Sequence, residues 1–425
     1  MPFVELTSTG PLTLNYYIKP MAILKKKLHI ILVFAFGFSC TFASGSKKKD
    51  ELYTSPNSYK TGSQSQRIQR AINDARKTTG KVVIPRYDEI EKTSVWLLDQ
   101  AILLPADFEL ELNNCKIKLS DKCRDNFIRS ANSGLGIKNI VPLKNIKISG
   151  RGNVLLEGAD NPRSTGDHNK VLSANPKGYG ASYGSDAGKP DQNQRGGWRN
   201  HAIILAYVDV FEISGIKLKD YHGHGIVMER CTNGIVKDIT FEVSQTVHVG
   251  GSERQVLNQD GLGVRFGCKN IMISNCRGRT GDDFINIGLT DTGIDAGTEN
   301  VNVVSGSVYK GEQDDIANIF LQNWQDFYSI SHRAIRIMPA GKLRISHIFI
   351  ENMLMSPLTR QGFVAEYPQH IQGLVVRNLI TYHQLQAKGI SNATFRDILY
   401  IGDGTPIDVV PGETVFLENV RKMIK

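Results

Sequence analysis

The sequence predicts an all-β fold, a single-stranded right-handed parallel β-helix with an N-terminal capping helix. Three observations predict it. A strand-like segment recurs at intervals whose shortest steps are roughly 22 residues, an asparagine or aspartate opens most copies, and an amphipathic helix precedes the first copy. One short strand cannot bury an apolar face alone, whereas stacked coils can. A β-sandwich is the alternative, but it favours hairpin turns such as Asn-Gly, which are scarce here.

The first 43 residues are typical of a secretory signal peptide. Lys25-Lys26-Lys27 precede an apolar run from Leu28 to Phe38, and small residues extend to Ala43. The run is shorter than the ~20 residues that a membrane-spanning helix needs. We therefore expect a protein that is secreted or periplasmic, cleaved near Ala43 and without a transmembrane helix. Met21 is an alternative start of translation, and a lipoprotein anchored at Cys40 is the alternative to cleavage.

The net charge of +9 raises the question of a nucleic-acid partner. Much of the positive excess lies in the leader and in a polar tether, residues 44–63. No later block of Lys and Arg is interleaved with aromatic residues, as a nucleic-acid surface would require. The sequence therefore predicts no nucleic-acid partner.

The β-helix domain is expected over residues 64–425, beginning with the capping helix. Ile68, Ala71, Ile72 and Ala75 follow helical spacing, and such a helix would cover the open apolar end of the first coil. The strand-like copies begin at Lys144, Val208, Thr232, Lys269, Glu299, Ser346, Gln372, Asn392 and Glu413.

Two further features of this repeat are a pair of cysteines and a long loop. Cys231 and Cys268 take equivalent places in successive copies, which favours an interior ladder of thiols. The sequence contains no Cys-x-x-Cys pair, so it does not indicate a zinc site. Residues 158–200 lack periodicity and form a long loop, which is usually functional or disordered. Trp198, near the end of this loop, is expected to line a substrate groove.

Three carboxylates are the candidate catalytic residues. Asp260 lies in Asn-Gln-Asp-Gly, and Asp282 and Asp283 lie in Gly-Asp-Asp, 22 residues after Asp260. That distance is one coil, so Asp260 and Asp282 are expected about 5–7 Å apart if they share a face. Two carboxylates so close raise one pKa, and glycosidic hydrolysis needs one protonated and one ionised carboxyl group. Neighbouring strand residues point to opposite faces, so a turn or bulge at Gly281 must bring Asp283 to the same site.

The order of these motifs resembles the polygalacturonase-type glycoside hydrolases, family twenty-eight, and their pectin-lyase-like solenoid. The likeness is most specific over residues 258–287. It implies that Asp282 is the general acid, while Asp260 and Asp283 hold and activate the water of an inverting attack. It also implies that Asn258 binds substrate, with Gln259 where the family has threonine.

Two further motifs depart from the family pattern. Arg336-Ile337-Met338 resembles the Arg-Ile-Lys motif that grips a uronate carboxylate, with Met in place of Lys. The family's Gly-His-Gly follows the aspartate doublet by about one coil, but here no histidine occurs between Asp283 and His332. Gly223-His224-Gly225 precedes the aspartates. His224 is therefore expected to take the place of the family's Gly-His-Gly histidine, from the coil before the aspartates. His222 lies two residues before His224, so on a strand both side chains could point to the same face. The alternative is that the histidine has only a structural role in a turn. Arg265 is a weaker candidate.

Together these features predict an exported glycoside hydrolase that cleaves an acidic polysaccharide, pectin-like or algal, by inversion. We expect a monomer with no cofactor and no metal. A calcium-dependent polysaccharide lyase, in which the aspartates would bind Ca²⁺, is one alternative. A non-catalytic polysaccharide-binding β-helix is another, and a transferase or epimerase also stays open.

Overall fold

The computed structural model describes residues 53–123, 125–133, 140–160, 167–171, 193–195, 201–244, 246–249, 252–255, 259–289, 309–326, 332–339, 341–409 and 414–423. The chain divides into two units, residues 1–50 and 51–425, and all described residues belong to the second. The predicted leader, with Met21 and Cys40, lies outside the described residues, as do Trp198 and Asn258. So does most of the predicted loop 158–200.

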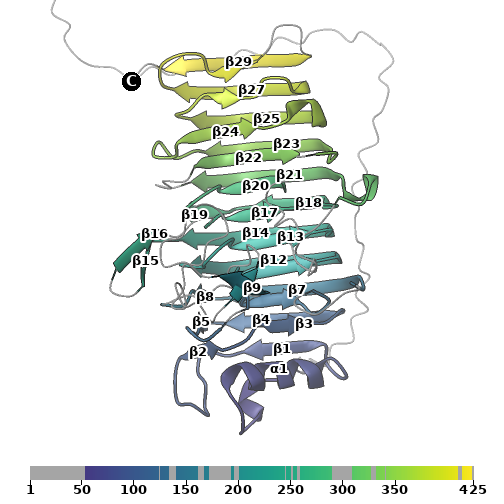
Figure 1. Ribbon diagram of the computed structural model, residues 1–425, viewed down its shortest axis with the longest axis vertical. Coiled ribbons are helices and arrows are strands. Elements are labelled where there is room, and N and C mark those ends of the chain that lie inside the picture. Colours follow the sequence, from purple (N-terminus) through teal and green to yellow (C-terminus); the bar gives the residue numbers. More distant parts are fainter. Residues whose placement is uncertain are drawn as a thin grey trace, which may run out of the picture. The chain divides into compact units, whose positions relative to one another are not determined.

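The second unit is a right-handed parallel β-helix, which confirms the predicted fold class (Figure 1). Within the described residues, every pairing in its two large sheets is parallel. The longer strands of the first sheet stack in the order β1 (Lys81–Ile84), β4 (Phe108–Asn113), β7 (Leu143–Arg151), β12 (Val208–Lys219), β14 (Thr232–Glu242), β18 (Lys269–Ser274), β21 (Ile316–Asp326), β23 (Ile345–Leu354), β25 (Ile371–Thr381), β27 (Ser391–Ile401) and β29 (Val415–Met423).

The second large sheet is built from shorter strands. They stack in the order β3 (Ile102–Leu104), β6 (Ile128–Ser130), β11 (Ile203–Ala206), β13 (Ile226–Glu229), β17 (Leu262–Val264), β20 (Ile285–Leu289), β22 (Arg333–Pro339), β24 (Gln361–Ala365), β26 (Leu385–Gln386) and β28 (Ile407–Asp408). The first sheet is extended at one side by β2 (Val95–Leu98), β5 (Lys116–Leu119), β8 (Leu155–Glu157) and β19 (Arg277–Arg279).

The remaining elements lie outside these sheets. Two antiparallel pairs are formed by β9 (Asp167–Val171) with β10 (Asn193–Arg195) and by β15 (Thr246–Val249) with β16 (Ser252–Gln255). Short 3-10 helices are η1 (Pro56–Ser58), η4 (Glu312–Asp314) and η5 (Pro368–His370). No helix among the described residues is both long and apolar enough to cross a membrane.

Inward-facing columns of apolar side chains form the core. Ile213, Val236, Ile273 and Leu321 stand in register on successive coils and are almost completely buried. Cys231 and Cys268 are likewise one coil apart, and both are buried free thiols, as the predicted ladder requires. Each donates its S–H to a backbone carbonyl, Cys231 to Leu205 and Cys268 to Met228.

Asparagine turns bend several of the coils. Asn270, the second residue of β18, and Asn275, which directly follows it, both have left-handed backbones, with φ of 57° and 54°. Asparagine adopts this conformation more readily than most residues. Its side-chain amide also continues from coil to coil: Asn270 donates to Asn233 at 3.0 Å, and Asn318 donates to Asn270 at 2.9 Å. The recurrent asparagine therefore serves both as a turn residue and as a link between neighbouring coils.

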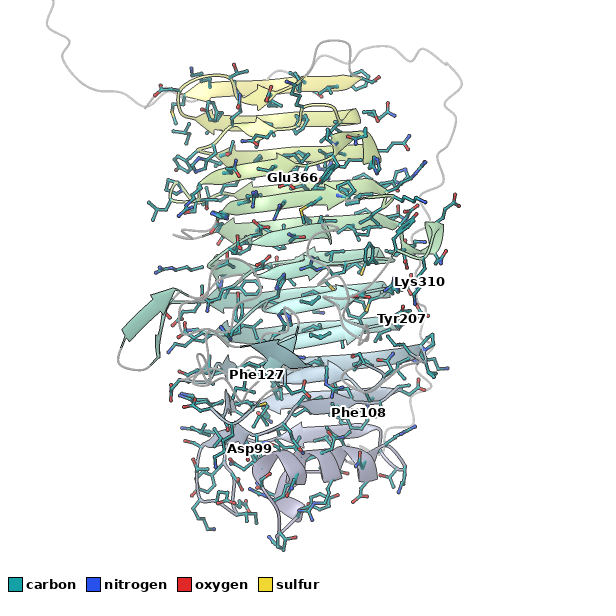
Figure 2. All side chains as sticks on the ribbon, viewed as in Figure 1. Asp99, Phe108, Phe127, Tyr207, Lys310 and Glu366 are labelled. Atoms are coloured by element: carbon teal, nitrogen blue, oxygen red, sulfur yellow. The ribbon has the colours of Figure 1, made fainter. Side chains whose placement is uncertain are left out.

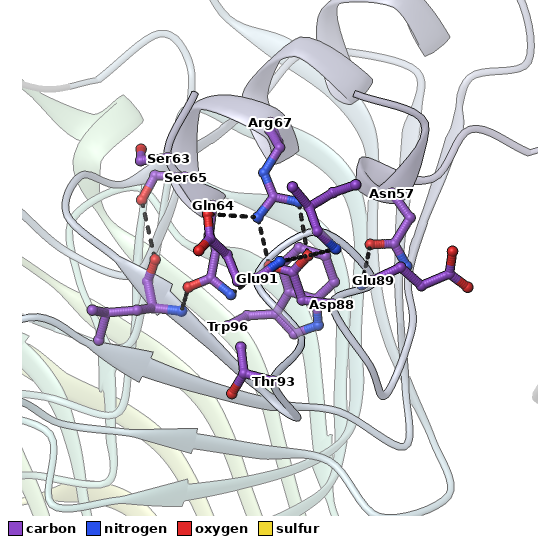
Figure 3. A network of polar contacts seen from close by, with 12 residues as sticks. Asn57, Ser63, Gln64, Ser65, Arg67, Asp88, Glu89, Glu91, Thr93 and Trp96 are labelled. Carbon is purple, nitrogen blue, oxygen red and sulfur yellow. Dashed lines mark hydrogen bonds and ion pairs between the residues drawn. The ribbon is translucent and has the colours of Figure 1, made fainter. Parts of the chain in front are cut away.

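Helix α1 (Gln64–Ala75) caps the first coil, as predicted, and its four predicted core residues are fully buried. Ser63 and Gln66 form a capping box at its start. Beneath it, Arg67 Nη1 donates to Asp88 Oδ1 at 2.8 Å, and Gln64 Nε2 donates to Asp88 Oδ2 at 2.7 Å (Figure 3). The helix is therefore fixed to the first coils by apolar contacts and by a buried ion pair.

Two details differ from the sequence analysis. The described end of the predicted tether, 53–63, is structured: Thr54 exchanges backbone hydrogen bonds with the β1 segment at 3.0 and 3.1 Å. The predicted strand at Glu299 lies outside the described residues, and the coil after β18 is formed by β21, which the repeat pattern missed. Its asparagine, Asn318, lies 48 residues after Asn270, far from the expected interval.

Candidate active site

The candidate site lies where successive strands of the second sheet begin. The N–H groups of Gly225, Gly261 and Phe284 donate across the coils to the carbonyls of Asp260, Asp283 and Arg333, at 2.9, 3.0 and 2.9 Å. Since Leu262 pairs with Ile226 and Ile285, this register places four residues in one column. In coil order the column consists of His224, Asp260, Asp283 and Arg333.

The register corrects one expectation. Asp260 lies in line with Asp283, because Leu262 pairs with Ile285, and Asp282 lies in line with Gln259 instead. Asp282 nevertheless belongs to the same site through a turn of the predicted kind. The N–H groups of Gly281 and Asp282 both donate to Gln259 O, at 2.9 and 3.3 Å. The structure thus brings the three predicted aspartates together, with Asp282 one-fifth exposed and Asp283 almost fully buried.

The electrostatics of the cluster favour a retained proton. Burial, together with the charges of Asp282 and Asp283, raises the pKa of Asp260 well above its ordinary value, despite the nearby Arg265 and Arg336. Burial also raises the pKa of Asp283, although Arg336, Arg333 and a hydrogen bond from Asn286 at 3.0 Å oppose the rise. The arrangement can therefore hold a proton on one carboxyl group beside an ionised one.

A buried histidine from the coil before Asp260 and a buried arginine from the coil of Asp260 adjoin this cluster. His224 Nε2 lies 3.3 Å from Asp260 Oδ2 and 2.7 Å from Arg265 Nη2. A guanidinium group only donates, so Nε2 accepts and the ring proton belongs on Nδ1. The backbone N–H of His224 also donates to His201 Nδ1 at 2.6 Å. His224 thus takes the position expected of it, whereas for His222 the structure adds that its side chain is buried.

The coil after Asp282 and Asp283 carries a histidine that lies far from them in the sequence. His332 Nδ1 lies 3.5 Å from Asp282 Oδ1, although the two residues are 50 positions apart. Arg360 Nη1 lies 2.9 Å from His332 Nε2, so this nitrogen accepts and Nδ1 carries the proton that faces Asp282. Burial, Arg360 and Arg333 lower the pKa of His332. The expectation that no histidine follows the doublet by one coil is therefore wrong, because the chain between these coils is unusually long.

Arg336 faces the site, but it already has two carboxylate neighbours. Its Nη1 lies 3.7 Å from Asp283 Oδ2, and its Nε and Nη2 lie 2.9 and 2.8 Å from Glu366 Oε1. Glu366 follows β24 on the next coil and is labelled in Figure 2. The predicted clamp is therefore part of a larger cluster of charges.

Sequence reasoning missed His332, Arg333, Arg360 and Glu366. One signal was available for the first two, because Asp-Asp-Phe-Ile-Asn-Ile at 282–287 and His-Arg-Ala-Ile-Arg-Ile at 332–337 share one pattern. The pairing of Asn286 with Arg336 shows that they are equivalent. In the described part of the chain, no group of three or more His, Cys, Asp or Glu side chains is arranged to hold a metal ion.

A parallel β-helix with a carboxylate cluster of this kind has the paired acid and base that a solenoid glycoside hydrolase requires. The chain belongs to family 28 of the glycosyl hydrolases, whose family model matches residues 163–398. No curated protein sequence matches the chain.

Similar solved structures include a surface adhesin and two exopolygalacturonases. PfbA of Streptococcus pneumoniae shares 13% identity, over 88% of this chain and 99% of that one, with a TM-score of 0.49. The family 28 exopolygalacturonase of Yersinia enterocolitica shares 14% identity, over 88% and 78%, with a TM-score of 0.43. The exopolygalacturonase of Thermotoga maritima shares 15% identity, over 86% and 92%, with a TM-score of 0.45.

Proposed function

We propose that this glycosyl hydrolase is an exported enzyme that cleaves an acidic, uronate-containing polysaccharide with inversion at the anomeric carbon. The observation that carries the proposal is the meeting of three carboxylates beside Arg333 and Arg336. Carboxyl groups of unequal pKa supply the acid and base of glycosidic hydrolysis. Guanidinium groups bind carboxylates in a directional manner, which suits a uronate substrate.

Exposure assigns the roles within the cluster. Asp282 is the most exposed of the three and faces the Nδ1–H of His332, so it is the group able to reach the glycosidic oxygen. It acts as the general acid. Asp260 and Asp283 are buried behind it and hold the attacking water, with the anionic member serving as base.

Reducing-end release and ultraviolet absorbance, measured together on plant and algal polysaccharides, test this function. The proposal expects new reducing ends from polygalacturonate, with no ultraviolet-absorbing product and no effect of a chelator. Nuclear magnetic resonance of the first product should show the inverted anomer. Ultraviolet-absorbing product that disappears with chelator would indicate the lyase instead.

The variant Asp282→Asn should lower kcat at least about a thousandfold while leaving the circular dichroism spectrum unchanged. Asp99→Asn, an exposed aspartate near the capping helix, is the matched control and should retain full activity (Figure 2). Full activity in Asp282→Asn would refute the catalytic assignment.

The export part of the proposal is supported by the apolar run before Ala43. Expression in a host with a Sec pathway should yield mature protein outside the cytoplasm whose first residue follows Ala43. A lipid-modified N-terminus at Cys40 would indicate the anchored form instead.

A further inference from the structure

Four charged side chains from three consecutive coils form a closed ring of alternating sign. Arg333 Nη1 lies 3.4 Å from Asp283 Oδ1, and Arg333 Nη2 lies 3.7 Å from Glu366 Oε1. Arg336 completes the ring, with Glu366 on one side at 2.8 Å and Asp283 on the other at 3.7 Å. Two cations and two anions thus face one another, and one of the anions, Asp283, belongs to the catalytic cluster.

The two anions of this ring differ in accessibility. The Asp283 side chain is 2% exposed and is held by Asn286, so it cannot leave. The Glu366 side chain is 28% exposed, and the two arginines are 19% and 21% exposed. The buried pair Arg67–Asp88, at 0% exposure on both sides, shows what a purely structural pair looks like in this protein. A ligand can therefore approach the arginines on the side that Glu366 occupies.

We propose that Glu366 is a specificity-determining residue: its carboxylate occupies the anion position on Arg336 and Arg333, and a substrate uronate must displace it to bind them. This inference rests on the proposed function. Glu366 acts as a built-in competitor, so only a substrate group that is itself an anion replaces it without leaving the guanidinium groups unpaired. A neutral or methyl-esterified sugar cannot make that exchange, whereas a free uronate can.

Substitution Glu366→Gln tests the inference because it keeps the shape but removes the competing charge. Binding is measured by calorimetry in the full-length Asp282→Asn protein, with oligogalacturonate and its methyl-esterified counterpart as probes. We expect Glu366→Gln to tighten oligogalacturonate binding roughly tenfold and to steepen its salt dependence, while binding of the esterified oligomer changes less than twofold. Glu351→Gln is the matched control, since Glu351 also pairs with an arginine of the next strand, Arg377, at 2.8 Å and is 25% exposed.

The outcomes separate this inference from the proposed function. If oligogalacturonate binds but Glu366→Gln leaves its affinity unchanged or weakens it, the inference is wrong while the function stands. Equal tightening for both oligomers, or the same gain in Glu351→Gln, would also overturn it. If the parent protein neither binds nor hydrolyses any uronate polymer, the proposed function fails and the inference falls with it.

Discussion

The ion pair under the capping helix offers a sharp test of how the solenoid end is stabilised. Asp88→Asn keeps the shape of the side chain but removes the buried counter-ion of Arg67, which then has only the half-exposed Glu91, 3.8 Å away, as a described carboxylate partner. Breaking a buried pair in this way costs about 3–5 kcal/mol. An independent figure comes from the pKa: burial alone would raise it, but hydrogen bonds from Arg67 and Gln64 lower the pKa of Asp88 from 3.8 to about 2. That difference corresponds to about 2 kcal/mol of net stabilisation.

The lowered pKa of Asp88 also determines how the free energy of unfolding depends on pH. A carboxyl group whose pKa is lowered by folding stabilises the protein above its unfolded value, and the contribution is lost as pH falls through the folded value. The wild-type protein should therefore lose about 2 kcal/mol more than Asp88→Asn between pH 5 and pH 2, in urea unfolding followed by circular dichroism.

Hydrogen exchange locates the effect. Because α1 packs against β1, β2 and β3 of the first coils, its amides should exchange roughly 100-fold faster or more in Asp88→Asn, while amides of β25 and β27 change little. Asp74→Asn, an exposed aspartate of the same helix that accepts from Tyr59, is the control. A loss below about 1 kcal/mol, or equal loss in Asp74→Asn, would refute the reasoning.

Three further predictions follow from the site and the ladders. In Arg336→Gln the strongest opposing charge on Asp283 is gone, so its pKa should rise further and the acidic limb of the kcat–pH profile should move to higher pH; a limb that stays or moves down would contradict this. Asn275→Ala removes a left-handed asparagine and its ladder bonds at 3.1 and 3.2 Å, and should cost about 2–4 kcal/mol in urea unfolding, with Asn275→Gly recovering part of the loss. Burial raises the pKa of the Cys268 and Cys276 thiols to about 12, so neither should react with iodoacetamide at pH 8 until the protein unfolds, as peptide mapping would reveal.

Much of the fold could be predicted because its signals are local. Alternation along a strand decides which side chains point inward, and asparagine at a bend follows from its tolerance of positive φ. The apolar spacing of Ile68, Ala71, Ile72 and Ala75 likewise predicted α1. The three aspartates of the site could also be selected, because they lie about one coil length apart and their motifs resemble those of a known family.

The neighbours of those aspartates could not be predicted, because coil length is irregular. Ladder bonds between consecutive coils join residues that are 37, 48 and 26 positions apart at Asn233–Asn270, Asn270–Asn318 and Asn352–Asn378. A fixed repeat therefore assigns wrong partners, and it placed Asp260 beside Asp282 where the register places Asp283.

By itself, then, the sequence determined the β-helix, its capping helix, its interior columns and the identity of the acidic cluster. Only the tertiary structure decided which side chains meet across the coils: His332 beside Asp282, Arg333 in line with Asp283, and Glu366 on Arg336. The physical reason is that the inward or outward direction of a side chain depends on its position along a single strand. The distance between charges, by contrast, depends on the register between strands, which backbone hydrogen bonds set only after the insertions between coils are accommodated.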